Sequence, residues 1–112
     1  MAVNEIEIAA APDDVWAVLA EPDAYARWVV GTKRIRGADE GFPDVGTRLH
    51  HTTGVGPLTI RDSTVVLRSE RPRVLELEAR LGPLGSAHVT LRLEEGGAGT
   101  RVVMKERGLR GA

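Results

Sequence analysis

Two neighbouring segments with a strict two-residue alternation constrain the fold of this chain most strongly. Apolar residues alternate with charged ones from Leu75 to Leu81, and apolar residues alternate with polar ones from Ala87 to Leu93. Such alternation is typical of strands that have one apolar face and one face toward water. Because residues 82–85 are Gly-Pro-Leu-Gly, we expect a turn there and antiparallel pairing of the two strands.

The other predicted elements follow from alternation and from turn-forming residues. Pro12 is followed by two aspartates, which indicates the first turn of a short helix, because proline and acidic side chains are both favoured there. A second Pro-Asp pair at 22–23 indicates another short helix that reaches Val29. Further strands are predicted at residues 3–8, 33–37, 47–53, 58–69 and 100–106, with an acidic loop at 38–45.

This order of elements predicts an α+β fold, in which one curved antiparallel sheet follows two short N-terminal helices. The 112 residues are expected to form a single domain, 1–112, with 42% hydrophobic residues to supply its core. A chain of this length buries about two thirds of its unfolded surface, so it needs no disulfide, and it contains no cysteine.

The charge pattern excludes several kinds of partner. With 15 basic and 16 acidic residues the formal net charge is −1, which argues against a nucleic-acid partner.

The opening residues lack the apolar core of a signal peptide, and no apolar run reaches the roughly 18 residues of a membrane span. We therefore expect a cytoplasmic protein without membrane insertion.

Three stretches carry a resemblance to a known superfamily: Ile8 to Trp16, Pro22 to Trp28 and Gly46 to Val66. In sequence and order they resemble the START-like or SRPBCC superfamily, and more narrowly its bacterial polyketide cyclase/dehydrase-type group. The resemblance implies a helix-grip fold around a ligand cavity. It leaves the chemistry open, because the superfamily includes lipid carriers, hormone receptors, ring-closing enzymes and cochaperone domains.

One feature departs from that superfamily. Its members close the cavity with a long C-terminal helix, whereas only residues 107–112 follow the last predicted strand here. As a helix those residues would span about 9 Å, against about 25–33 Å for the sheet. The C-terminal helix is therefore expected to be missing: either the chain is a truncated piece or a second molecule covers the sheet. We expect self-association, as in a homo-oligomer, or poor order at the uncovered face. Light scattering that finds a stable monomer would contradict this expectation.

Polar residues in two predicted strands are the candidate site. Leu49 shares a face with His51, which makes His51 the inward residue of the pair with His50. The register of strand 58–69 is ambiguous, so either Arg61 or Asp62 approaches the cavity. Hairpin pairing would bring His51 opposite residues 60–62, where a hydrogen bond to a carboxylate would raise its basicity. His51 and Asp62 are thus candidates for acid/base catalysis, although a buried structural pair is the plainer interpretation.

The leading functional hypothesis is binding of a small hydrophobic molecule, lipid-like or polycyclic, between sheet and helices. Trp28 would lie at the cavity mouth, and His51 with Arg61 or Asp62 would hold the ligand's polar end. A polyketide cyclase/dehydrase-type enzyme and a module that docks a partner helix are the alternatives. No metal or nucleotide cofactor is expected, because His50 and His51 point to opposite faces. The expected apolar lining consists of Leu77, Ala79, Val89, Leu91, Val102 and Met104.

Overall fold

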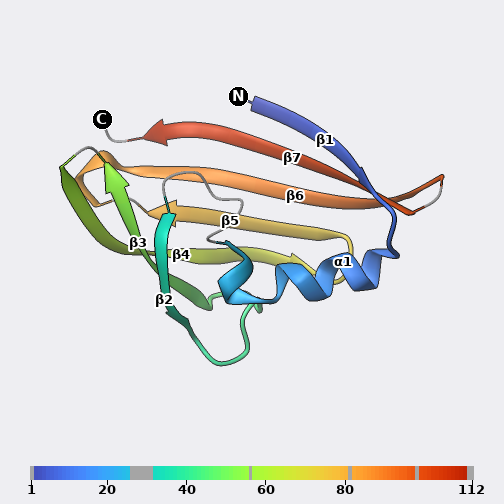
Figure 1. Ribbon diagram of the computed structural model, residues 1–112, viewed down its shortest axis with the longest axis horizontal. Helices are drawn as coiled ribbons and strands as arrows, with labels where there is room; N and C mark the ends of the chain where they lie inside the picture. Colours follow the sequence, from blue (N-terminus) through green and yellow to red (C-terminus); the bar gives the residue numbers. More distant parts are fainter. Residues whose placement is uncertain (1, 26–31, 56, 81, 98, 111–112) are drawn as a thin grey trace.

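The computed structural model describes residues 2–25, 32–55, 57–80, 82–97 and 99–110. Within them, seven strands form one curved antiparallel sheet in the order β1-β7-β6-β5-β4-β3-β2 (Figure 1). One α-helix, α1 (Pro12–Leu19), and two 3₁₀ turns, η1 (Pro22–Ala24) and η2 (Gly82–Leu84), accompany the sheet. The strands are β1 (Ala2–Ile8), β2 (Thr32–Ala38), β3 (Arg48–Val55), β4 (Leu58–Glu70), β5 (Val74–Arg80), β6 (Ser86–Gly96) and β7 (Gly99–Arg110).

The path of the chain explains why the helix lies against the sheet. Strands β1 and β2 form opposite edges, so the chain crosses the sheet between them, and α1 and η1 lie on that crossing. From β2 onward each strand pairs with the next, and β7 finally pairs with β1. The predicted antiparallel meander is therefore confirmed, including the hairpin between β5 and β6.

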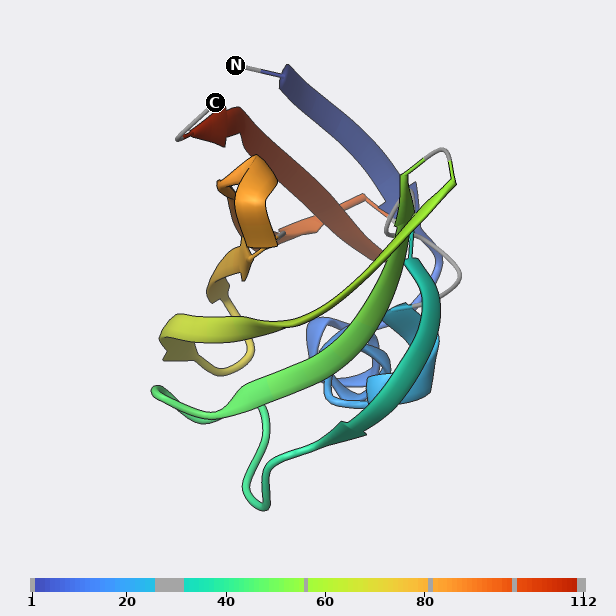
Figure 2. The same ribbon diagram turned by 90° about the vertical axis from the view of Figure 1, so that its left-hand side faces the viewer.

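Alternation along the strands separates an inner face of the sheet, toward α1, from an outer face. Directly paired residues share a face, so Leu75 lies beside Leu91 and Val66 beside Leu77 on the inner face. Figure 2 shows the strands curving around α1. Buried residues of the sheet and the helix form one core cluster, which contains Val15, Trp16, Leu19, Tyr25, Leu49, Val66, Leu75, Leu77, Leu91, Leu93 and Val102.

The second predicted helix is not an α-helix at its start. Pro22–Ala24 forms the 3₁₀ turn η1, and residues 26–31, which include Trp28, lie outside the described residues. Tyr25 ends this turn and is 1% exposed. Its hydroxyl donates to the carbonyl oxygen of Leu19 at 2.6 Å, and its ring meets Phe42 edge-on at a centroid distance of 5.7 Å. Tyr25 itself is α-helical, so the described part of the predicted helix consists of η1 and this one residue, which is held by a tertiary hydrogen bond and aromatic packing.

Strand β1 also differs from its prediction as a half-buried strand. Ile6 and Ile8 share the inner face as expected, but they are 60% and 37% exposed. The buried side chains of α1 pack with those of β3 to β7, whereas β1 is an edge strand. Period-two alternation therefore identified the strand correctly without revealing that its inner face is uncovered among the described residues.

Candidate functional site

An apolar patch lies on the inner face beside the packed core. It consists of Ala79 in β5, Ala87 and Val89 in β6, and Met104 in β7, all only partly buried. Register joins them, because Ala79 pairs with Ala87, and the core residue Leu77 pairs with Val89. We call these four residues the apolar floor. Three residues of the predicted lining do not belong to it, since Leu77, Leu91 and Val102 are at most 9% exposed and pack in the core with α1.

His51 lies next to this floor. It occupies the inner face of β3 with Leu49, as expected, and is 4% exposed. Its Nε2 lies 3.0 Å from the hydroxyl oxygen of Thr64 in β4, and Thr64 is itself 7% exposed. Because Thr64 pairs with Ala79, this polar pair directly borders the apolar floor. Sequence analysis missed Thr64, although its place two residues after Asp62 on the same strand face was available as a signal.

The register of β4 is settled by its pairing with β3 and β5. His51 pairs with Asp62, and Thr64 with both Leu49 and Ala79, so Ile60, Asp62, Thr64 and Val66 face inward. Arg61 consequently faces outward, where it is exposed. The expectation that Arg61 contacts a ligand is therefore wrong. Water solvates its guanidinium on the outer face, whereas burial inside would require a partner.

The carboxylate of Asp62 is engaged with the backbone. Its Oδ1 accepts the N–H of Ser63 and its Oδ2 accepts the N–H of Gly82, both at 2.8 Å. Asp62 therefore fastens turn η2 to β4 beside the polar pair. The pairing brings His51 opposite Asp62, as the sequence predicts, and Nε2 of His51 lies within hydrogen-bond distance of the Thr64 hydroxyl.

We expect Asp62→Asn to loosen turn η2. An amide keeps one acceptor oxygen but places an NH₂ group against the second backbone N–H, so one charge-assisted hydrogen bond is lost, at a cost of about 1.5–3 kcal/mol. Amide hydrogen exchange would report this as faster exchange at Gly82. Arg61→Gln is the control, because Arg61 lies on the outer face. Equal exchange rates at Gly82 in the wild type and in Asp62→Asn would contradict the anchoring role.

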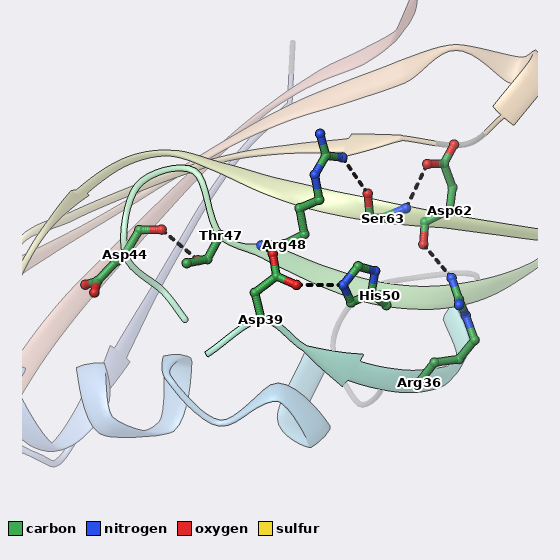
Figure 3. Close-up of polar contacts among 8 residues, drawn as sticks. All are labelled: Arg36, Asp39, Asp44, Thr47, Arg48, His50, Asp62 and Ser63. Atoms are coloured by element: carbon green, nitrogen blue, oxygen red, sulfur yellow. Dashed lines mark hydrogen bonds and ion pairs between the residues drawn. The ribbon is translucent and has the colours of Figure 1, made fainter. Parts of the chain in front are cut away.

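Arg36 is a second residue that sequence reasoning missed. From β2 its Nη2 donates to the carbonyl oxygen of Asp62 at 3.1 Å (Figure 3) and to the carbonyl oxygen of His51 at 3.4 Å. The β2–β3 register shifts between Ile35 and Gly37, so Arg36 lies at an irregularity that alternation cannot indicate. Its guanidinium thus links β2 by hydrogen bonds to β3, which carries His51, and to β4, which carries Asp62.

The neighbouring polar contacts lie outside the site. His50 Nε2 is 2.9 Å from Oδ1 of Asp39, and Nη1 of Arg48 donates to the Ser63 hydroxyl at 2.9 Å (Figure 3). Arg48 and His50 alternate with Leu49 and therefore belong to the outer face of β3. The two adjacent histidines thus serve different faces of the sheet, as the sequence predicts.

Burial lowers the pKa of His51 from 6.5, because desolvation disfavours the charged imidazolium. The Asp62 carboxylate and a hydrogen bond with the Ser63 backbone oppose this shift, and the charge of Arg36 reinforces it. His51 is therefore neutral at neutral pH. A neutral imidazole and a threonine hydroxyl form an uncharged polar pair that can donate and accept hydrogen bonds.

This lowered pKa predicts a pH-dependent stability. As the pH falls below 6.5 the unfolded chain binds a proton at residue 51 before the folded chain does, so the free energy of unfolding decreases. We expect His51→Gln to flatten this dependence in denaturant titrations at pH values below 6.5, relative to wild type. His50→Gln is the matched control, and it should retain the His51 contribution. An NMR titration in which the pKa of His51 is 6.5 or higher would contradict the assignment.

Among the described residues, no three His, Cys, Asp or Glu side chains are grouped so that they could hold a metal ion. Within the same part of the chain, no helix has both the length and the hydropathy that a membrane crossing requires.

Comparison with known proteins shows what this chain is similar to. A protein of Mesorhizobium loti is 22% identical with a TM-score of 0.68, over 97% of this chain and 76% of that chain. A protein of Rhodobacter sphaeroides is 22% identical with a TM-score of 0.71, over 93% and 69%. The di-domain ARO/CYC BexL of the BE-7585A biosynthetic pathway is 14% identical with a TM-score of 0.69, over 94% of this chain and 34% of that chain.

These TM-scores show a shared fold, and a comparison with curated proteins gives no match. The model of one family, described as polyketide cyclase / dehydrase and lipid transport, matches residues 2–111. Because that match spans nearly the whole sequence, the chain belongs to this polyketide cyclase / dehydrase and lipid transport family, within the START-like superfamily.

Proposed function

We propose that this chain binds a small hydrophobic ligand on the apolar floor and holds the ligand's polar end at His51 and Thr64. One observation carries the proposal: Thr64 pairs directly with Ala79, so a buried polar pair borders partly exposed apolar residues on one face. Ligand sites in proteins have this composition, with apolar walls and few polar groups that orient the ligand. The lipid transport named in the family description supports the same function.

Extraction of the purified protein with organic solvent, followed by mass spectrometry, tests this proposal. We expect a hydrophobic molecule at near-stoichiometric amount from the wild type and a reduced amount from Val89→Asp, which places a charge on the floor. Glu78→Asp on the outer face is a control for handling and purity. Wild-type protein that neither retains such a molecule nor binds any added hydrophobic probe would contradict ligand binding.

Acid/base catalysis in the manner of a cyclase is the second candidate. The observation that favours it is the buried position of His51 on the inner face, with the Thr64 hydroxyl 3.0 Å from its Nε2 and the apolar floor beside them. A histidine unprotonated at neutral pH has a nitrogen able to accept a proton from a bound ketide. The Asp62 carboxylate, on the residue paired with His51, accepts the Ser63 and Gly82 N–H groups. Turnover that disappears in His51→Gln while ligand affinity persists would favour catalysis over binding alone.

A further inference from the structure

The described lysine and arginine side chains of β3 to β7 lie on the outer face of the sheet, which they share with acidic side chains such as Glu76 and Glu78. Strand pairing assigns the cationic side chains of the central strands to the outer face, because each alternates with a residue that faces inward. On β7 the cationic side chains Arg101, Lys105 and Arg107 alternate outward in the same way. The cations of β3 to β6 are Arg48, Arg61, Arg68, Arg80 and Arg92.

The charged side chains that face inward next to the site are acidic. Asp62 lies opposite His51, and Glu106 lies opposite Val89 of the apolar floor. The elements laid across the inner face, α1, η1 and the loop at 39–47, contribute acidic residues and, among the described residues, no lysine or arginine. Arg36 is a described cation beside the pair, and it is exposed and donates to the His51 and Asp62 carbonyl oxygens.

The polar pair at the end of the floor is therefore placed in a neutral to negative environment. Its members, His51 and Thr64, are 4% and 7% exposed and offer hydrogen bonds without a formal positive charge. A buried anion needs a paired cation, because desolvation otherwise outweighs its hydrogen bonds. A hydroxyl group needs no such partner, because it both donates and accepts hydrogen bonds, as the Thr64 hydroxyl does.

From the outward placement of the cations and the inward placement of Asp62 and Glu106, we propose that the site selects a hydrophobic ligand whose buried polar group is an uncharged hydroxyl. The site rejects the same ligand with an anionic head. The inference rests on the proposed binding function and specifies its ligand class. It assigns Asp62 and Glu106 a role in specificity in addition to the backbone contacts of Asp62. The arginines of β3 to β6 face outward, so they do not pair with an anionic ligand head on the inner face.

Three ligands with the same ten-carbon chain test the inference: 1-decanol, decanoate and decylammonium. Each displaces a fluorescent apolar probe from wild-type protein at about pH 8, where the acid is ionised and the amine is protonated. We expect 1-decanol to bind at least about tenfold more tightly than decanoate, because only the anion enters without a cation to pair with it. Equal or tighter binding of decanoate overturns the inference, and so does decylammonium binding more tightly than 1-decanol.

The two failures can be told apart. If the probe and all three ligands fail to bind, the proposed function is wrong and the selectivity falls with it. If the ligands bind with no preference for the alcohol, only the selectivity is wrong.

Variants on the rim of the site separate charge from shape. Glu106 is exposed, so Glu106→Gln should fold, and we expect it to narrow the ratio of decanol to decanoate affinity. Asp62→Asn should narrow the ratio as well, and Glu76→Gln on the outer face should leave it unchanged. A ratio that stays at the wild-type value in both Glu106→Gln and Asp62→Asn contradicts the proposed role of inner-face charge.

Discussion

Leu75→Ala should destabilise the folded chain by about 2–5 kcal/mol, because it leaves a cavity in a closely packed core. Leu75 is 0% exposed, pairs with Leu91 and belongs to the same buried cluster as Trp16. A loss of this size approaches the whole stability of a small domain. Chemical denaturation followed by tryptophan fluorescence or circular dichroism would measure it.

Leu67→Ala provides a matched control, since it removes the same atoms from a leucine that is 43% exposed. This change should alter the free energy of unfolding by no more than about 0.5 kcal/mol. If the two variants lose stability equally, the core does not lie between the inner face and α1.

Ala79→Phe should lower the affinity for an apolar probe by at least about tenfold, because the new ring fills the floor to which a ligand would bind. Ala79 is partly buried between Thr64 and Ala87, so a phenyl ring there covers both the floor and the approach to the polar pair. Probe fluorescence titration measures the dissociation constants of the wild type and the variant.

Thr90→Phe is the control for added hydrophobic surface. Thr90 pairs with Glu76 and Lys105 on the outer face, so the phenyl ring there cannot reach the floor. We expect wild-type probe affinity in this variant. If Ala79→Phe binds the probe as tightly as Thr90→Phe does, the ligand site is not on the inner face.

The sequence predicted the strands well because alternation is a local property. Segments starting near Leu75 and Ala87 became β5 and β6, and adjacent His50 and His51 separated onto opposite faces. The family resemblance was confirmed by a match over residues 2–111. Local patterns of this kind need no knowledge of what lies across the sheet.

Features that depend on a distant partner could not be predicted in this way. The inward choice of Asp62 over Arg61 depends on pairing with both β3 and β5, because both faces of β4 carry a charge. The partner of the Asp62 carboxylate is the N–H of Gly82, twenty residues along the chain. Arg36 reaches the site only because β2 is irregular there. Each case is decided by tertiary geometry.

The sequence also could not show which of the inward apolar residues remain partly exposed. Leu77, Leu91 and Val102 have the same alternation as Val89 and Met104, and all were expected to line a pocket. Packing divides them, since the first three belong to the core with α1 and the other two remain partly exposed. Hydrophobic pattern identifies the apolar face, but the position of α1 decides which part of it is open.

Methyl NMR on the ligand-free chain titrated with 1-decanol would test most directly where an apolar ligand binds. The methyl groups of Ala79, Ala87, Val89 and Met104 should shift together, while those of Leu67 and Val103 should stay at their original positions. Saturating decanol that leaves the first group unchanged, or that moves both groups to the same degree, would contradict a binding surface on the inner face of the sheet.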